Sequence, residues 1–128
     1  MEHEDLILTV EHLKSRDGRY KIQAYFFTMD ALEFTMARLG RRGHVSGGEL
    51  LEGVAVLAKR EFGPTAKMVL ENWGIRETRD FGEIVFSLVN AGLLGKTDED
   101  SIEDFESVYD FDEVFEKHYD WKVEEPLP

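Results

Sequence analysis

The stretch SGGELLEGVAVLAKREF, residues 46–62, opens the part of the chain that decides the fold. Its first four residues form a capping box, because the Ser46 hydroxyl can accept from a free backbone N–H while Glu49 reaches back. Apolar residues then recur at helical spacing, from Leu50 to Phe62. The stretch therefore predicts an amphipathic helix over residues 46–62.

Two more helices follow from the residues downstream. Pro64 is tolerated in the first turn of a helix, which predicts a short second helix over residues 64–73. Gly74 suits the left-handed position after that helix. Thr78 or Asp80 can cap a third helix over residues 79–91.

A small β-hairpin is expected after the third helix. Leu93-Leu94 follow a glycine turn, and Phe105, Tyr109 and Phe111 alternate at period two, which is a strand pattern. Three helices and a hairpin are the winged-helix order. The predicted fold is mainly α, a compact helical domain with a winged-helix-like unit (three helices plus a small β-hairpin) in residues 46–111.

The flanks add helices on both sides of this unit. Apolar spacing predicts a helix over residues 4–14 and a core helix from Ile22 to Gly40, where the glycine stops it. A short final helix is expected at 112–119. We expect a single helical domain over residues 1–119 and a frayed acidic C-terminus over 120–128.

Charge is distributed unevenly along the 128 residues. Residues 1–96 carry 14 acids and 13 bases, whereas residues 97–128 carry 13 acids and two bases. The chain has no cysteine, which excludes disulfides and thiolate sites. The acidic start does not resemble a secretory signal, and no apolar run has the length of a membrane span. Cytoplasmic localisation is expected.

This charge makes DNA binding unlikely for a winged helix. The third helix would enter the major groove, but it offers Arg79, Asp80, Glu83 and Asn90, a net negative set. The expected wing, residues 97–106, is strongly acidic and would repel phosphates.

The most basic patch is a loop at residues 38–44, which we call the basic loop. It carries Arg38, Arg41, Arg42 and His44, with glycines on both sides of the central arginines. A G-x-x-G loop with basic middle residues is how KH domains hold a nucleic-acid backbone. These residues are the candidate anion-binding site. The alternative is that they pair with the acidic C-terminal segment.

A second candidate, an interaction surface, is the turn that contains Trp73, Arg76 and Arg79. Tryptophan and arginine are favoured anchors at interfaces. The competing interpretation, which we favour, is that Trp73 closes the core at a helix end and the arginines form solvent ion pairs.

Signs of metal or catalytic chemistry are missing from the sequence. Asp98, Asp100, Asp104 and Glu106 invite a calcium interpretation, but the glycine and glutamate of an EF-hand are not in register. No histidines share a ligand spacing, and no phosphate loop or nucleophile elbow is present. We expect no metal, no cofactor and no catalytic residue, although an enzyme with a dispersed site stays open.

Several runs together resemble an uncharacterised bacterial protein family, found mainly in planctomycete and verrucomicrobial genomes. They are residues 20–35 (YKIQAYFFTMDALEFT), 44–53 (HVSGGELLEG), 73–76 (WGIR), 80–86 (DFGEIVF) and 109–111 (YDF). The resemblance covers about residues 4–119. It implies a bacterial cytoplasmic origin and a free-standing domain, and it brings no activity, cofactor or catalytic residue.

The functional prediction combines these observations. A strongly acidic segment without catalytic motifs favours a non-enzymatic protein-interaction or scaffold domain, which binds a protein partner or itself. The alternative is nucleic-acid or anionic-ligand binding through the basic loop.

Overall fold

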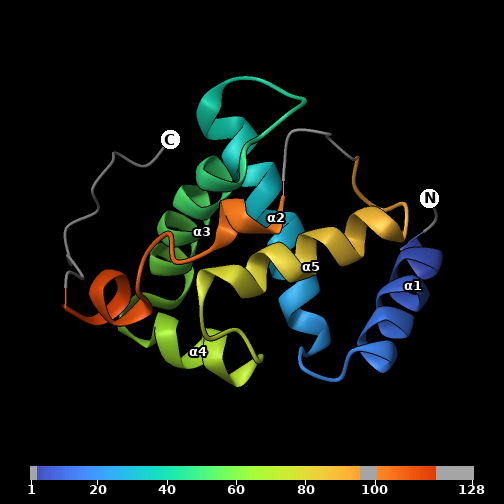
Figure 1. Cartoon of the computed structure of the whole chain (residues 1–128), viewed down its shortest axis with the longest axis horizontal. Helices are drawn as coiled ribbons and strands as arrows, with labels where there is room; N and C mark the ends of the chain where they lie inside the picture. The colour runs from blue at the N-terminus through green and yellow to red at the C-terminus, as the bar shows by residue number, and fades with distance from the viewer. Residues whose placement is uncertain (1–2, 96–100, 118–128) are drawn as a thin grey trace.

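The computed structural model describes residues 3–95 and 101–117, and this part of the chain is mainly helical, as predicted (Figure 1). The α-helices are α1 (His3–Arg16), α2 (Ile22–Leu39), α3 (Gly47–Phe62), α4 (Ala66–Asn72) and α5 (Thr78–Asn90). Three short turns complete the fold: η1 (Gly63–Thr65) and η2 (Ile102–Phe105), which are 3-10 helices, and η3 (Asp112–Lys117), a π-helical turn. None of the described helices is long and apolar enough to cross a bilayer.

The predicted start of α3 is confirmed. Ser46 Oγ accepts from the Glu49 N–H at 3.1 Å, and the Glu49 carboxylate accepts from the Ser46 N–H at 3.0 Å. Both backbone donors would otherwise lack an intrahelical partner, so this reciprocal pair fixes where the helix begins.

The predicted hairpin is wrong: residues 3–95 and 101–117 contain no β-strand, so a winged-helix unit is not supported. Gly92 adopts a left-handed φ of 80°, and the Leu93 N–H donates to the Leu88 carbonyl at 2.9 Å. This is a Schellman motif, which folds Leu93 back on the end of α5 instead of starting a strand. Residues 97–100 of the expected wing lie outside the described residues.

The expected second strand is also replaced, by η2 and an irregular segment held through a side chain. The buried Thr78 hydroxyl donates to the Phe105 carbonyl at 2.6 Å and accepts from the Val108 N–H at 3.1 Å. One threonine on α5 therefore satisfies two backbone groups that a strand partner would have bonded.

The helices pack closely where small residues permit it. A methyl group added at Gly53 on α3 would lie 1.8 Å from the Thr35 hydroxyl on α2, so these two helices cross at a glycine. In the same way, a Cβ at Gly82 on α5 would lie 2.7 Å from the ring of Phe105. Phe105 therefore packs directly against the backbone of α5 and is only 2% exposed.

The C-terminal segment, residues 101–117, runs across α3 toward α4 (Figure 1). It buries the aromatic rings of Phe105, Phe111 and Phe115 against the helices. The predicted final helix at 112–119 is a π-helical turn over the described part, and residues 118–119 lie outside it, as does the terminus predicted to fray, 120–128.

Candidate functional site

Arg41 of the basic loop is bound into the cap of α3. Its Nη2 donates to both oxygens of the Glu49 carboxylate, at 2.8 and 3.1 Å. The Ser46 N–H, followed by the Arg41 guanidinium, lowers the pKa of the Glu49 carboxyl. A carboxylate of the helical body therefore balances the charge of Arg41.

Two other basic-loop residues also have neighbours in the body. Arg42 forms an exposed ion pair with Glu33 on α2, at 3.6 Å. The guanidinium of Arg38 lies 5.9 Å from the centre of the Phe34 ring, within range of a cation–π contact. His44 is exposed and points to a hollow described below. The loop is thus a set of locally paired cations rather than one converging anion cradle.

The structure places Trp73 against the core at the end of α4. Its ring centre lies 5.7 Å from that of Phe27 and 5.5 Å from that of Phe62, and its carbonyl accepts from the Lys21 N–H at 3.0 Å. The indole is half-buried. This placement supports the interpretation that Trp73 closes the core.

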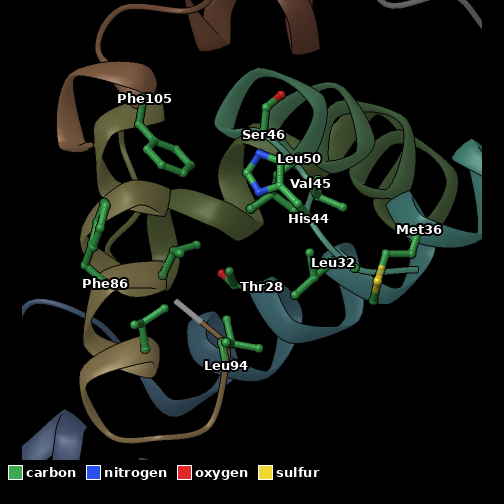
Figure 2. A pocket seen from close by; sticks show the side chains of 14 residues that line it. Thr28, Leu32, Met36, His44, Val45, Ser46, Leu50, Phe86, Leu94 and Phe105 are labelled. Atoms are coloured by element: carbon green, nitrogen blue, oxygen red, sulfur yellow. The ribbon is translucent and has the colours of Figure 1, made fainter. Parts of the chain in front are cut away.

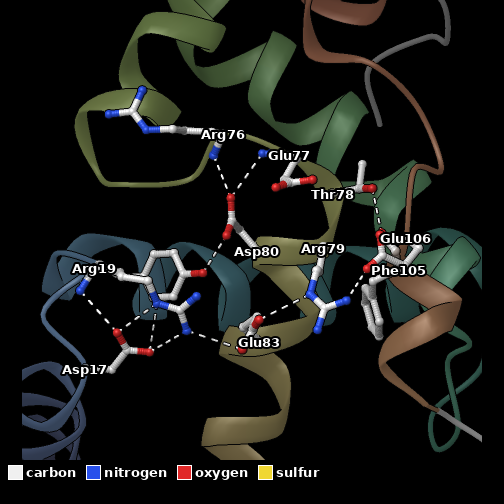
Figure 3. Close-up of polar contacts among 11 residues, drawn as sticks. Asp17, Arg19, Arg76, Glu77, Thr78, Arg79, Asp80, Glu83, Phe105 and Glu106 are labelled. Atoms are coloured by element: carbon white, nitrogen blue, oxygen red, sulfur yellow. Dashed lines mark hydrogen bonds and ion pairs between the residues drawn. The ribbon is translucent and has the colours of Figure 1, made fainter.

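The two arginines of the predicted interaction surface do not converge with Trp73 on one ligand. Arg79 is paired with Glu83 and with Glu106 of the acidic segment. The Arg76 backbone N–H donates to Asp80 at 2.8 Å, while its guanidinium extends away from the other labelled groups (Figure 3).

A polar network at the start of α5 joins it to the connection between α1 and α2 (Figure 3). The Tyr20 hydroxyl donates to the Asp80 carboxylate at 2.6 Å. Burial, and then this hydrogen bond, raises the pKa of Tyr20. Arg19 bridges Asp17 at 2.7 Å and Glu83 at 3.3 Å. Each of these groups has a partner within the network, which indicates a structural role.

An apolar hollow that the sequence did not predict lies between α2, α5 and the end of the basic loop (Figure 2). Its volume is about 420 Å³, within the range of ligand pockets. We call this set of residues the apolar hollow: Thr28, Leu32, Met36, Gly43, His44, Val45, Ser46, Leu50, Val85, Phe86, Val89, Leu94, Gly95 and Phe105.

Four parts of the chain build its walls: α2, the end of the basic loop with the start of α3, α5 with the residues after it, and η2. Helix α2 supplies Leu32 and Met36, and α5 supplies Val85 and Val89, one turn apart on one face. The ring of Phe105 closes one side at 6.3 Å from the ring of Phe86, measured between centres. The four helical side chains are only half-buried, so apolar surface stays open to solvent.

The polar groups of the hollow are few and are partly engaged in the fold. The Thr28 hydroxyl donates to the Ala24 carbonyl at 2.8 Å, and Ser46 Oγ accepts from the Glu49 N–H. Among the described lining residues, His44 alone carries a titratable side chain. Such a lining suits the burial of apolar groups and offers few groups for acid–base chemistry.

The residues 3–95 and 101–117 also bring together no group of three or more His, Cys, Asp or Glu side chains that could hold a metal ion. Of the acidic residues weighed for calcium, Asp98 and Asp100 lie outside these ranges. Asp104 accepts from the Ser101 N–H, at 2.8 Å, and Glu106 pairs with Arg79.

Sequence patterns indicated only part of the hollow. Leu32 and Met36, like Val85 and Val89, are four residues apart, which is typical of one apolar helix face. That spacing does not show that the two faces leave space between them. The volume depends on how α2 and α5 pack, which residue spacing does not encode.

Comparisons of the chain with protein-family models, with curated proteins and with solved structures give no match. The resemblance to the planctomycete and verrucomicrobial family stays a prediction, and the function has to be argued from the residues of this chain.

Proposed function

We propose that this protein is a non-enzymatic interaction domain, which binds a protein partner by receiving a large apolar side chain of that partner in the apolar hollow. The observation that carries this proposal is a hollow of about 420 Å³ whose apolar walls stay half-exposed. Burial of such surface by a partner is favourable, at about 25 cal/mol per Å² of apolar area.

The chemistry of the lining favours binding over catalysis. A hydrolase or transferase site needs a nucleophile, a base and charge stabilisation within reach of one another. The described lining supplies hydroxyls that already bond to backbone groups and one exposed imidazole. A large aromatic side chain, in contrast, finds apolar contacts from α2 on one side and α5 on the other.

The basic-loop alternative receives less support. Nucleic-acid binding requires cations that can leave their neighbours for phosphates. Arg41 is bonded to both oxygens of Glu49, and Arg42 to Glu33. Each would have to give up a carboxylate to bind a phosphate, which lowers the affinity of the loop for nucleic acid.

The test is a selection of random peptides on the intact chain, repeated with a variant whose hollow is filled. Val89→Trp places an indole in the hollow, and we expect selected peptides to lose at least about tenfold in affinity, measured by fluorescence anisotropy. Met68→Trp is the matched control, because Met68 is also on a helix but is 63% exposed and outside the lining.

The melting temperature of both variants shows whether each is folded. Peptides that bind Val89→Trp as well as they bind the unaltered chain would refute the proposal. The proposal also fails if the selection enriches no peptide with a large apolar residue.

A further inference from the structure

The charge around the apolar hollow differs between its two sides. On the side of the basic loop, Arg41 pairs with Glu49 and Arg42 pairs with Glu33. These two cations each have a carboxylate within 4 Å, so the two pairs present little net charge to an approaching molecule.

The opposite side, formed by η2, carries carboxylates. Glu103 and Asp104 directly precede the wall residue Phe105, and both are exposed. Within residues 3–95 and 101–117, neither has an ion pair with a cationic side chain, and Asp104 accepts only from the Ser101 N–H. A Cβ placed on Gly47, beside the lining residue Ser46, would lie 3.2 Å from the Asp104 Cβ. Asp104 therefore lies beside the edge of the hollow, and Glu103 precedes it in the same turn.

The chain as a whole is also negative. It has 27 acidic and 15 basic residues, a formal net charge of −12, and most of the excess acid lies in residues 97–128, the segment that contains Glu103 and Asp104. A field of this sign attracts cationic segments and repels nucleic acid and anionic lipid, over about 8–10 Å at physiological salt.

We infer that the partner segment is basic: it inserts a large apolar side chain into the apolar hollow and places a lysine or arginine beside Glu103 and Asp104. The inference rests on the proposed function, because it names the chemistry of the partner for that site. Apolar contact supplies most of the affinity, while the charges select the partner and speed its encounter.

The experiment extends the peptide selection with charge variants of the intact chain. We expect the enriched peptides to carry a lysine or arginine near the large apolar residue. Their affinity should fall about two- to tenfold in Glu103→Gln/Asp104→Asn, and the dependence of affinity on salt should weaken. Both substitutions keep the shape of the side chain, and the amide oxygen introduced by Asp104→Asn can still accept from the Ser101 N–H.

Glu52→Gln/Glu61→Gln is the control for total charge. It removes the same two charges from exposed positions on α3 that do not line the hollow. Affinity in this control should stay within about twofold of the unaltered chain.

Two results would distinguish a failure of the basic-partner inference from a failure of the proposed function. If hollow-dependent peptides are neutral or acidic, or if both charge variants bind equally, the basic partner is refuted while the interaction domain stands. If no selected peptide depends on the hollow, the proposed function itself is refuted and the basic partner with it.

Discussion

At the scale of single residues, Thr78 links α5 to the segment that follows η2. It is fully buried on α5, and its hydroxyl bonds to backbone groups 27 and 30 residues away in sequence. The course of the chain after η2 therefore depends on Thr78. A local sequence pattern cannot predict this, because the two parts lie far apart in the sequence.

Replacement of the Thr78 hydroxyl should destabilise the fold. We expect Thr78→Val to lower the free energy of unfolding by about 1–3 kcal/mol, because two backbone groups lose their partner. Thr65→Val is the control, since that hydroxyl donates to the Phe62 carbonyl at an exposed position and should matter by less than about 0.5 kcal/mol. Urea unfolding measures both, and equal losses would contradict the role given to Thr78.

At the scale of elements, the beginning of α3 is tied to pH through Glu49. The pKa of Glu49 is lower in the folded chain than its ordinary value of 4.5. The capping contribution is therefore complete above that value and is lost as pH falls through the folded-state pKa.

We expect Glu49→Gln to be less stable than the unaltered chain at neutral pH, with a difference that shrinks steadily below about pH 4.5. Chemical unfolding at a series of pH values measures this. Glu61→Gln, at an exposed position of the same helix and away from the cap, is the control for the loss of one negative charge. A Glu49→Gln difference that is constant with pH would exclude the proposed linkage.

The ends of the helices could be predicted from the sequence, whereas the segment after α5 could not. Helix starts and stops depend on neighbouring residues, so the Ser46–Glu49 box and the turn at Gly74, with φ of 96° and a buried Ile75, were foreseeable. The hairpin was not, because period-two spacing at Phe105 and Tyr109 also fits rings that dock on helices. The docked arrangement is fixed by hydrogen bonds of Thr78, which lies 27 residues before Phe105 in the chain.

The candidate site was less predictable than the fold. The basic loop and Trp73 stand out in the sequence because of their residue types, yet each is occupied by local contacts. The apolar hollow needs four segments at once, and its residues look like ordinary core positions.

At the scale of the whole molecule, the C-terminal segment joins the helical body through aromatic burial and through charge. Phe115 is 1% exposed, and Lys67 on α4 contacts Asp112 at 2.8 Å. The segment should therefore unfold together with the helices.

We expect Phe115→Ala to cost about 3–5 kcal/mol in the free energy of unfolding, because it empties a buried ring site. Val108→Ala, at a position 42% exposed, should cost less than about 1 kcal/mol. With the second tryptophan removed by Trp121→Phe, Trp73 fluorescence reports on the body and far-UV circular dichroism on all helices, so their transitions should coincide in each variant. A large loss for Val108→Ala, or transitions that separate, would contradict a single cooperative unit.

The shared carboxylate of Glu49 has a consequence for any anion that meets the basic loop. Because Arg41 and the first turn of α3 use the same acceptor, an external anion competes with the protein for its own arginine. The Glu49 carboxylate would keep its hydrogen bond to the Ser46 N–H after the loss of Arg41, so the cap itself would remain. What an anion has to overcome is the Arg41–Glu49 pair, and its affinity for the loop is lower by the strength of that pair.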